Sequence, residues 1–299
     1  MSPDSRSPPS VHRNPTDAAI GLYLVVTAGL LLFHRESLPG YRTYLALHLV
    51  GALLVGSLRY LPGKIPAAAA FLRDWYPAIL FPVLYKEVEV LAAAFGNWDL
   101  TSGVKKIEEW LFGGQPSLLL SEAFPFVPFS ELLHFCYLSY VLWFPLIGGY
   151  WYFTGERSRF HELLFLLALT YTASYLFYIL FPVDSPFYLQ PPLGPPLPGH
   201  FFHDLVHFVS SRGGARGGAF PSSHVSVSTV ILLTALKYER KWAAFLVPMY
   251  LGLVLSTVYG RFHYALDVLA GWALALVIVG WHHLSSRRNP VRRIPNAAR

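Results

Sequence analysis

Long apolar stretches separated by short polar segments dominate this chain. A helix needs about 20 apolar residues to cross the hydrocarbon core of a bilayer. We expect eight membrane-crossing helices, at 17–34, 44–61, 74–95, 131–153, 161–181, 223–238, 242–259 and 263–283. The third stretch departs from the pattern because it contains Lys86, Glu87 and Glu89, and the sixth is short for a full crossing. The pattern predicts an all-α, polytopic membrane helix bundle.

The polar segments divide the chain further. Residues 1–16 form a polar, Pro/Ser-rich tail, and the apolar stretch that follows lacks a small-residue cleavage site, so we expect it to be a retained helix. Residues 17–95 would hold the N-terminal transmembrane helices, and 96–130 reads as an amphipathic segment at the membrane interface. A helical core would follow at 131–284, and a basic tail at 285–299.

Composition supports a membrane setting. The 299 residues are 54% hydrophobic and 13% charged, with a mean hydropathy of +0.42, which is too apolar for an ordinary soluble domain. The sole cysteine, Cys136, excludes an intrachain disulfide and a cysteine-based metal cluster. The net charge of +6 comes from basic residues scattered between apolar stretches, so anionic lipid head groups are expected partners and nucleic acid is not. The sequence does not indicate an oligomeric state.

Basic residues also predict the orientation of the chain. If the eight stretches alternate in direction, fifteen Lys and Arg residues fall on one side of the membrane and seven on the other. Basic residues favour cytoplasmic loops, so both termini should be cytoplasmic. The opposite side would then be periplasmic, luminal or extracellular.

Three polar segments, 181–186, 220–224 and 259–267, fall on that predicted non-cytoplasmic side. In the second, Phe-Pro-Ser-Ser-His, Pro221 suits the first position of a helix and Ser222 or Ser223 can cap it. The N–H groups of such a first turn attract an anion such as phosphate, and His224 would lie close enough to protonate a leaving oxygen. A plain helix cap beside a membrane-surface histidine is the alternative.

In the third segment, His263 and Asp267 are four residues apart and share one face if the segment is helical. The carboxylate would then hold a proton on the nearer ring nitrogen, which leaves the other nitrogen free as a nucleophile, and it would stabilise the charge that develops on attack. An ordinary polar pair at a helix end is the alternative. An ionisable pair near a membrane edge is less often without function than a pair on a soluble surface, so both interpretations stay open at this point.

Taken together, the segments resemble the type-2 phosphatidic acid phosphatase superfamily, whose lipid phosphatases share a helical core with acid phosphatases and vanadium haloperoxidases. The closer likeness is to the inositolphosphorylceramide synthase branch, whose patterns Phe-Pro-Ser-x-His and Tyr-x-x-x-His-Tyr-x-x-Asp look like 220–224 and 259–267. The resemblance implies that residues 131–284 are a catalytic core. It also implies that His263 attacks phosphorus, Asp267 orients it and His224 protonates the leaving group. Ser223 and Ser222, with nearby backbone, would hold phosphate oxygens, without a metal or other cofactor.

The sequence departs from the phosphatase pattern in its cations. That pattern has an Arg six residues before the nucleophilic His, where this chain has Thr257, and an upstream Lys-x6-Arg-Pro element that is missing here. A transferring phosphoryl group still needs positive partners, and the candidates are Arg261, Arg212, Arg216 and Lys86. Arg212 and Arg216 could equally be solvated residues of a glycine-rich linker, and Lys86 could belong to an ion cluster within the bundle.

Other histidines and tyrosines carry less information. His203 and His207 are four apart and could bind a metal, but the sequence places no third ligand, and the phenylalanines around them favour an interfacial helix. We therefore expect no metal site. His134, Tyr137 and Tyr140 could line a cavity, although such spacing more often serves helix packing.

The sequence thus predicts a membrane enzyme that cleaves or transfers a phosphate ester of a lipid head group through a phosphohistidine, with its site on the non-cytoplasmic face. The branch resemblance favours transfer over hydrolysis. The rival is a non-catalytic lipid-binding or transport protein with a degenerate site, although no duplicated inverted half supports a transporter.

Overall fold

The computed structural model describes residues 14–60, 65–95 and 100–288. Within them the chain is all-α, with eleven α-helices and no strand. The only β-type pairing in this part is an isolated bridge between Val183 and Gly218. The predicted fold class is therefore confirmed.

The chain divides into two compact units, Met1–Ala78 and Ile79–Arg299. In the first, α1 (Pro15–Phe33) packs against α2 (Tyr41–Ser57), which a short 3-10 turn follows at Leu58–Tyr60. Asn14 caps α1 by accepting the N–H of Thr16 at 3.0 Å, and Pro15 takes the first helical position, where its missing N–H costs nothing. Helix α3 (Ala67–Phe95) begins in this unit and ends in the second.

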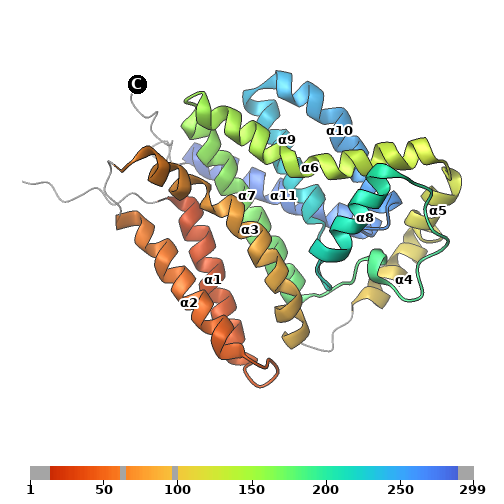
Figure 1. Ribbon diagram of the computed structural model, residues 1–299, viewed down its shortest axis with the longest axis horizontal. Helices are drawn as coiled ribbons and strands as arrows, with labels where there is room; N and C mark the ends of the chain where they lie inside the picture. Colours follow the sequence, from red (N-terminus) through yellow and green to blue (C-terminus); the bar gives the residue numbers. More distant parts are fainter. Residues whose placement is uncertain (1–13, 61–64, 96–99, 289–299) are drawn as a thin grey trace, which may run out of the picture. The chain divides into compact units, whose positions relative to one another are not determined.

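The second unit holds the remaining helices (Figure 1). They are α4 (Thr101–Phe112), α5 (Pro116–Ala123), α6 (Val127–Phe153), α7 (Arg157–Leu180), α8 (Phe201–Gly213), α9 (Ser223–Tyr238), α10 (Arg240–Tyr259) and α11 (Ala265–Arg288), with a 3-10 turn at Pro186–Tyr188. Helix α9 lies at the centre, in contact with α6, α7, α10 and α11. It is too short and too buried to face lipid widely, because most of its residues pack against these neighbours.

In the described part of the chain, five helices are long and apolar enough to cross a membrane, namely α1, α6, α7, α10 and α11. Their outward side chains are apolar, as Val141, Leu251 and Val277 show with exposures of 63%, 62% and 68%. A surface of this kind is stable in lipid and not in water. The chain is therefore a multi-pass integral membrane protein.

The other three predicted crossings are also helical but differ from these five. Helices α2 and α9 have 17 and 16 residues, and α3 carries five charged residues along its length. A crossing count of eight stays a prediction for this reason. In the predicted amphipathic segment 96–130, the structure has α4, α5 and the start of α6, and residues 96–99 lie outside the described part. Trp110 and Phe112 of α4 are exposed, and the location of this segment at the membrane interface stays a prediction.

Candidate active site

The three polar segments singled out in the sequence meet at one end of the second unit. Val183 donates its N–H to Gly217 O at 3.2 Å and accepts the N–H of Ala219 at 3.0 Å, which joins the first segment to the residues directly before the second. Ser185 Oγ donates to Phe262 O at 2.6 Å, which joins the first to the third. The turns that follow α7, precede α9 and separate α10 from α11 thus lie against one another.

His263 lies in the turn between α10 and α11 and is 4% exposed. Its Nδ1 is 3.0 Å from Ala219 O and 3.3 Å from Asp267 Oδ2. A carbonyl oxygen can only accept, so Nδ1 carries the proton and Nε2 keeps its lone pair. Burial lowers the pKa of His263 to about 4, so the ring is neutral near pH 7.

Asp267 stands in the first turn of α11 and is fully buried. The same Oδ2 that faces His263 accepts the N–H of Tyr264 at 2.9 Å, which fixes the carboxylate in place. The expected pairing of His263 with Asp267 is therefore present, but it does not run along a helix face, because α11 begins at Ala265, two residues after the histidine. Of the two contacts to His263 Nδ1, the one from the backbone carbonyl of Ala219 is the shorter, and no sequence motif indicates it.

His224 is the second residue of α9, and its Nδ1 lies 3.2 Å from Nε2 of His263. Since that Nε2 has a lone pair and no proton, His224 donates through Nδ1–H. The His224 ring stacks on Tyr137, with centroids 4.7 Å apart and planes 28° from parallel. The two histidines therefore face each other with one proton between them.

Ser222 is the N-cap of α9, and its Oγ accepts the N–H of Val225 at 3.3 Å. Its own N–H donates to Asp267 O at 2.9 Å, which ties the start of α9 to α11. The expectation that Pro221 occupies the first helical position is wrong, because Pro221 precedes the cap and Ser223 begins the helix. A proline before a capping serine fixes the entry of the chain without entering the helix.

Tyr178 of α7 supports this turn and was not anticipated from the sequence. Its hydroxyl donates to Pro221 O at 2.9 Å and accepts the N–H of Ser223 at 3.1 Å. The contact joins residues 45 positions apart, so no local motif could have revealed it. The N–H groups of Ser223 and Val225 are thus already bonded within the protein, although the first turn had been expected to offer its N–H groups to phosphate.

Gly271 explains how α11 comes so close to α9. A Cβ atom at this position would lie 2.7 Å from Ser222 O and 3.2 Å from Cβ of Val225. Only glycine allows that approach, because real Cβ atoms keep a larger distance from backbone oxygens. The close packing places Asp267 of α11 beside the N-cap of α9.

A cavity of about 210 Å³ opens beside the paired histidines. His224 and His263 form part of its wall, and the rest is mainly aromatic and apolar. Four tyrosines line it, namely Tyr85, Tyr137, Tyr140 and Tyr188. Neither lysine nor arginine is among the described residues that line it.

The side chains of the four predicted phosphate-binding cations contact other protein groups, and none of the four residues lines the cavity. Arg261, with a left-handed φ of 61°, donates from Nη1 to Pro195 O at 2.8 Å and from Nη2 to Ser121 Oγ at 3.1 Å. Arg216 Nη1 lies 3.6 Å from Asp184 Oδ2. Arg261 therefore joins the loop before α8 to α5, and Arg216 pairs with Asp184 of the first polar segment.

Arg212 lies in the last turn of α8, and the side chain of Lys86, a residue of α3, contacts this end of the helix. Lys86 Nζ donates to the carbonyls of Arg212 and Gly214 at 3.2 Å and 2.9 Å, as a cation at a helix C-terminus commonly does. The guanidinium of Arg212 sits 3.8 Å over the ring of Phe208. Lys86 thus holds the segment that forms one wall of the cavity, and the roles of all four cations in phosphate binding stay predictions.

The helices form a membrane bundle, and buried His263 and Asp267 lie with half-buried His224 beside a cavity. These features define a multi-pass membrane protein with a histidine-centred site. A model of the PAP2 superfamily matches residues 104–281, which is more than half of the chain and includes His224, His263 and Asp267. The chain therefore belongs to the PAP2 superfamily, whose members are phosphatases or phosphotransferases. No curated protein and no solved structure gives a significant match.

Family membership supports a lipid phosphatase-like function for this membrane protein and places it in the class of enzymes that act on phosphoric esters. It does not distinguish between branches of the superfamily.

Proposed function

We propose that the protein cleaves or transfers a phosphate ester of a lipid head group through a phosphohistidine on His263. The observation that carries the proposal is the Nδ1–H of His263 held on Ala219 O at 3.0 Å, which leaves Nε2 unprotonated on the wall of the cavity. A neutral imidazole with its other nitrogen anchored is a competent nucleophile.

In the first step, the Nε2 lone pair of His263 attacks phosphorus and the bond from phosphorus to the leaving oxygen breaks. His224 carries a proton on both ring nitrogens when the anionic phosphate is bound, gives its Nδ1 proton to that oxygen and is left as a neutral ring. In the free site the same proton points at His263 Nε2 over 3.2 Å, so a bound phosphate must take the place between the two rings. Positive charge develops on the His263 ring and is stabilised by Asp267 at 3.3 Å.

In the second step, an acceptor oxygen attacks the phosphorus of phosphohistidine and the N–P bond breaks. His224, now holding a lone pair at Nδ1, takes the proton of the acceptor hydroxyl. Water as acceptor releases phosphate or a phosphate monoester, and an alcohol gives a new ester. We favour an alcohol slightly, because 220–224 and 259–267 resemble the inositolphosphorylceramide synthase branch more than the phosphatases.

A lipid substrate suits the surroundings of the site. The cavity wall is aromatic and apolar, and the helices around it expose apolar side chains to the bilayer. The charged head group would approach from the aqueous face while acyl chains remain among the helices. The excess of basic residues on the opposite loops supports a non-cytoplasmic site with both termini in the cytoplasm.

The test uses the purified full-length protein in mixed micelles with phosphatidyl and sphingoid phosphates. Free phosphate and new head-group lipids are measured together. His263→Ala should reduce turnover to background, and His224→Ala should reduce it by about 10²- to 10⁴-fold, the range for loss of a general acid. His283→Ala, an exposed histidine near the end of α11, is the matched control. Near-normal turnover by a folded His263→Ala protein excludes this mechanism.

A non-catalytic lipid-binding or transport role is the rival, and one observation favours it. None of the described residues that line the cavity is a cation, although phosphoryl transfer needs positive partners. Vanadate mimics pentacoordinate phosphorus and separates the two: binding and inhibition support the enzyme, whereas lipid binding without turnover or vanadate binding supports the rival.

A further inference from the structure

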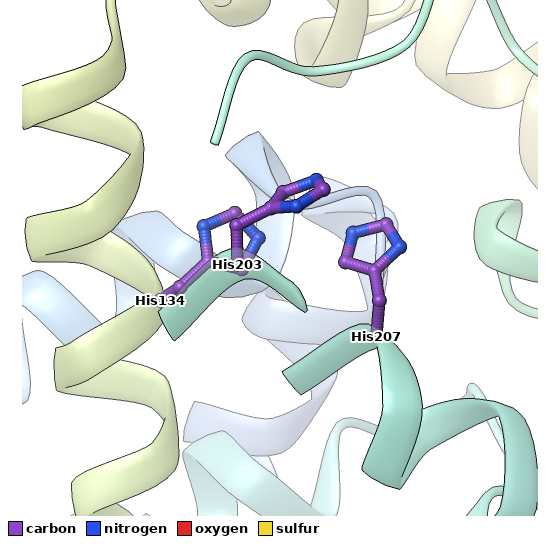
Figure 2. Close-up of side chains that lie close together, drawn as sticks. All are labelled: His134, His203 and His207. Carbon is purple, nitrogen blue, oxygen red and sulfur yellow. The ribbon is translucent and has the colours of Figure 1, made fainter. Parts of the chain in front are cut away.

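Three histidines gather between α6 and α8, outside the catalytic group. His134 comes from α6, and His203 and His207 from consecutive turns of α8 (Figure 2). One ring nitrogen of each lies within 4.8 Å of those of the other two. The third ligand that the sequence could not place is therefore His134, 69 residues before His203 along the chain.

Two of the three rings, those of His134 and His203, are already in the tautomer that a metal ligand needs. His134 Nδ1 lies 2.7 Å from Ser130 O, and His203 Nδ1 lies 2.8 Å from Asp204 Oδ1. A carbonyl and a carboxylate both accept, so each Nδ1 carries a proton and each Nε2 has a free lone pair. A carbonyl or carboxylate behind a histidine is also the usual outer partner of a metal-bound imidazole.

Two of the three Nε2 atoms, those of His134 and His207, have no hydrogen-bond partner among the described residues. His134 is fully buried, and its Nε2 makes no hydrogen bond within the described part of the chain; the same holds for the buried Nε2 of His207. Buried ring nitrogens are normally satisfied, and a cluster of lone pairs that face one another repels unless a cation or water lies among them.

We propose that His134, His203 and His207 bind one Zn²⁺ ion, which joins α8 to α6. Neutral imidazole is a preferred zinc ligand, and three histidines leave the fourth tetrahedral position for water. Two nitrogens on one tetrahedral zinc are about 3.3 Å apart, so small side-chain rotations from the present spacing complete the site.

The role of this ion is structural. The ring of Phe262, whose centroid is 5.9 Å from that of His134 and 6.0 Å from that of His207, lines the catalytic cavity. Val206 and Val209 of α8 line the same cavity. A zinc ion behind this wall would hold α8 in place without contacting the reacting atoms.

The experiment measures metal content. The full-length protein is purified with an affinity tag that contains no histidine, incubated with Zn²⁺, freed of loose metal and analysed by mass spectrometry. We expect about one zinc per chain. His203→Gln combined with His207→Gln should reduce the content to background, and His200→Gln, an exposed histidine at the N-cap of α8, should leave it unchanged.

Asp204→Asn provides a second variant with little risk to folding, because this side chain is 76% exposed. It weakens the outer partner of His203, so zinc affinity measured against a competing chelator should fall by about 10- to 100-fold. Zinc should also raise the melting temperature of the wild type and not that of the double variant. No zinc in the wild type, or equal zinc in the double variant, overturns the proposal. So does zinc that is lost only in His263→Ala, since that result places the ion at the catalytic site.

Discussion

The double anchoring of His263 leads to a quantitative prediction for Asp267→Asn. Asparagine has the same shape as aspartate, and its amide oxygen can take the place of Oδ2, where it still accepts from Tyr264 N and His263 Nδ1. The amide nitrogen then takes the place of Oδ1, which is buried and has no hydrogen-bond partner among the described residues. The variant should therefore fold with little change in geometry.

The expected loss of activity comes from charge alone. At 3.3 Å and an effective dielectric of about 20, a full positive charge on the ring gains about 5 kcal/mol from the carboxylate. About half of that charge has developed in the transition state, so the variant loses about 2.5 kcal/mol, or roughly 10²-fold in kcat. In triads where aspartate alone fixes the tautomer, the same change costs about 10⁴-fold. Here Ala219 O still holds the proton on Nδ1.

The assay is turnover of the substrate that the wild type processes best, with His263→Ala as the background. A loss as complete as that of His263→Ala would refute the tautomer argument, because the Ala219 carbonyl would then not hold the ring. A loss below about tenfold would mean that Asp267 does not stabilise charge on His263. The melting temperatures of both variants are measured as well, so that unfolding can be excluded as the cause of a loss of turnover.

Three further predictions concern the stability of the fold and the pH dependence of activity. Tyr178→Phe removes the hydrogen bonds to Pro221 O and Ser223 N and leaves both backbone groups buried and unpaired. The loss should destabilise the protein by about 1–3 kcal/mol. Thermal unfolding checks this prediction, and Tyr150→Phe, at an exposed tyrosine, is the control. Burial raises the pKa of Glu108 in α4 from 4.5 to about 7. Because the unfolded chain loses this proton more readily than the folded protein, the fold loses stability as pH rises from 4.5 to about 7. Glu108→Gln should therefore raise the melting temperature at about pH 8 and not at about pH 5. An equal rise in melting temperature at the two pH values contradicts this prediction. Because burial lowers the pKa of His263 to about 4, the acid limb of a kcat/KM profile should lie well below the ordinary histidine value, and a limb near 6.5 argues against a neutral buried nucleophile.

Local patterns predicted the helices well. Helix α9 was expected at 223–238 and is observed at Ser223–Tyr238, because a capping serine begins it and a continuous apolar run follows. Helices α7, α10 and α11 start and stop within a few residues of the expected bounds. The bounds of these helices depend on the spacing of apolar residues and on capping residues, and both can be read from the local sequence alone.

The supports of the site could not be predicted, because they depend on contacts between distant residues. Tyr178 and Ser223 are 45 positions apart, and His263 and Ala219 are 44 apart. His134 and His203 also meet only after α8 has packed against α6. The sequence identified the histidines and the aspartate as candidates, but which backbone group or third ligand faces them is decided by packing.

The carbonyl of Ala219 has a consequence for how such a site can change. A side chain at position 219 can be exchanged without removing the oxygen that holds His263, so a scan of point substitutions would pass over one of the groups nearest the nucleophile. Insertion or deletion of a single residue between 217 and 222, in contrast, would move that oxygen away while every histidine and aspartate remained. The spacing of this short segment, more than its composition, therefore sets which ring nitrogen reacts.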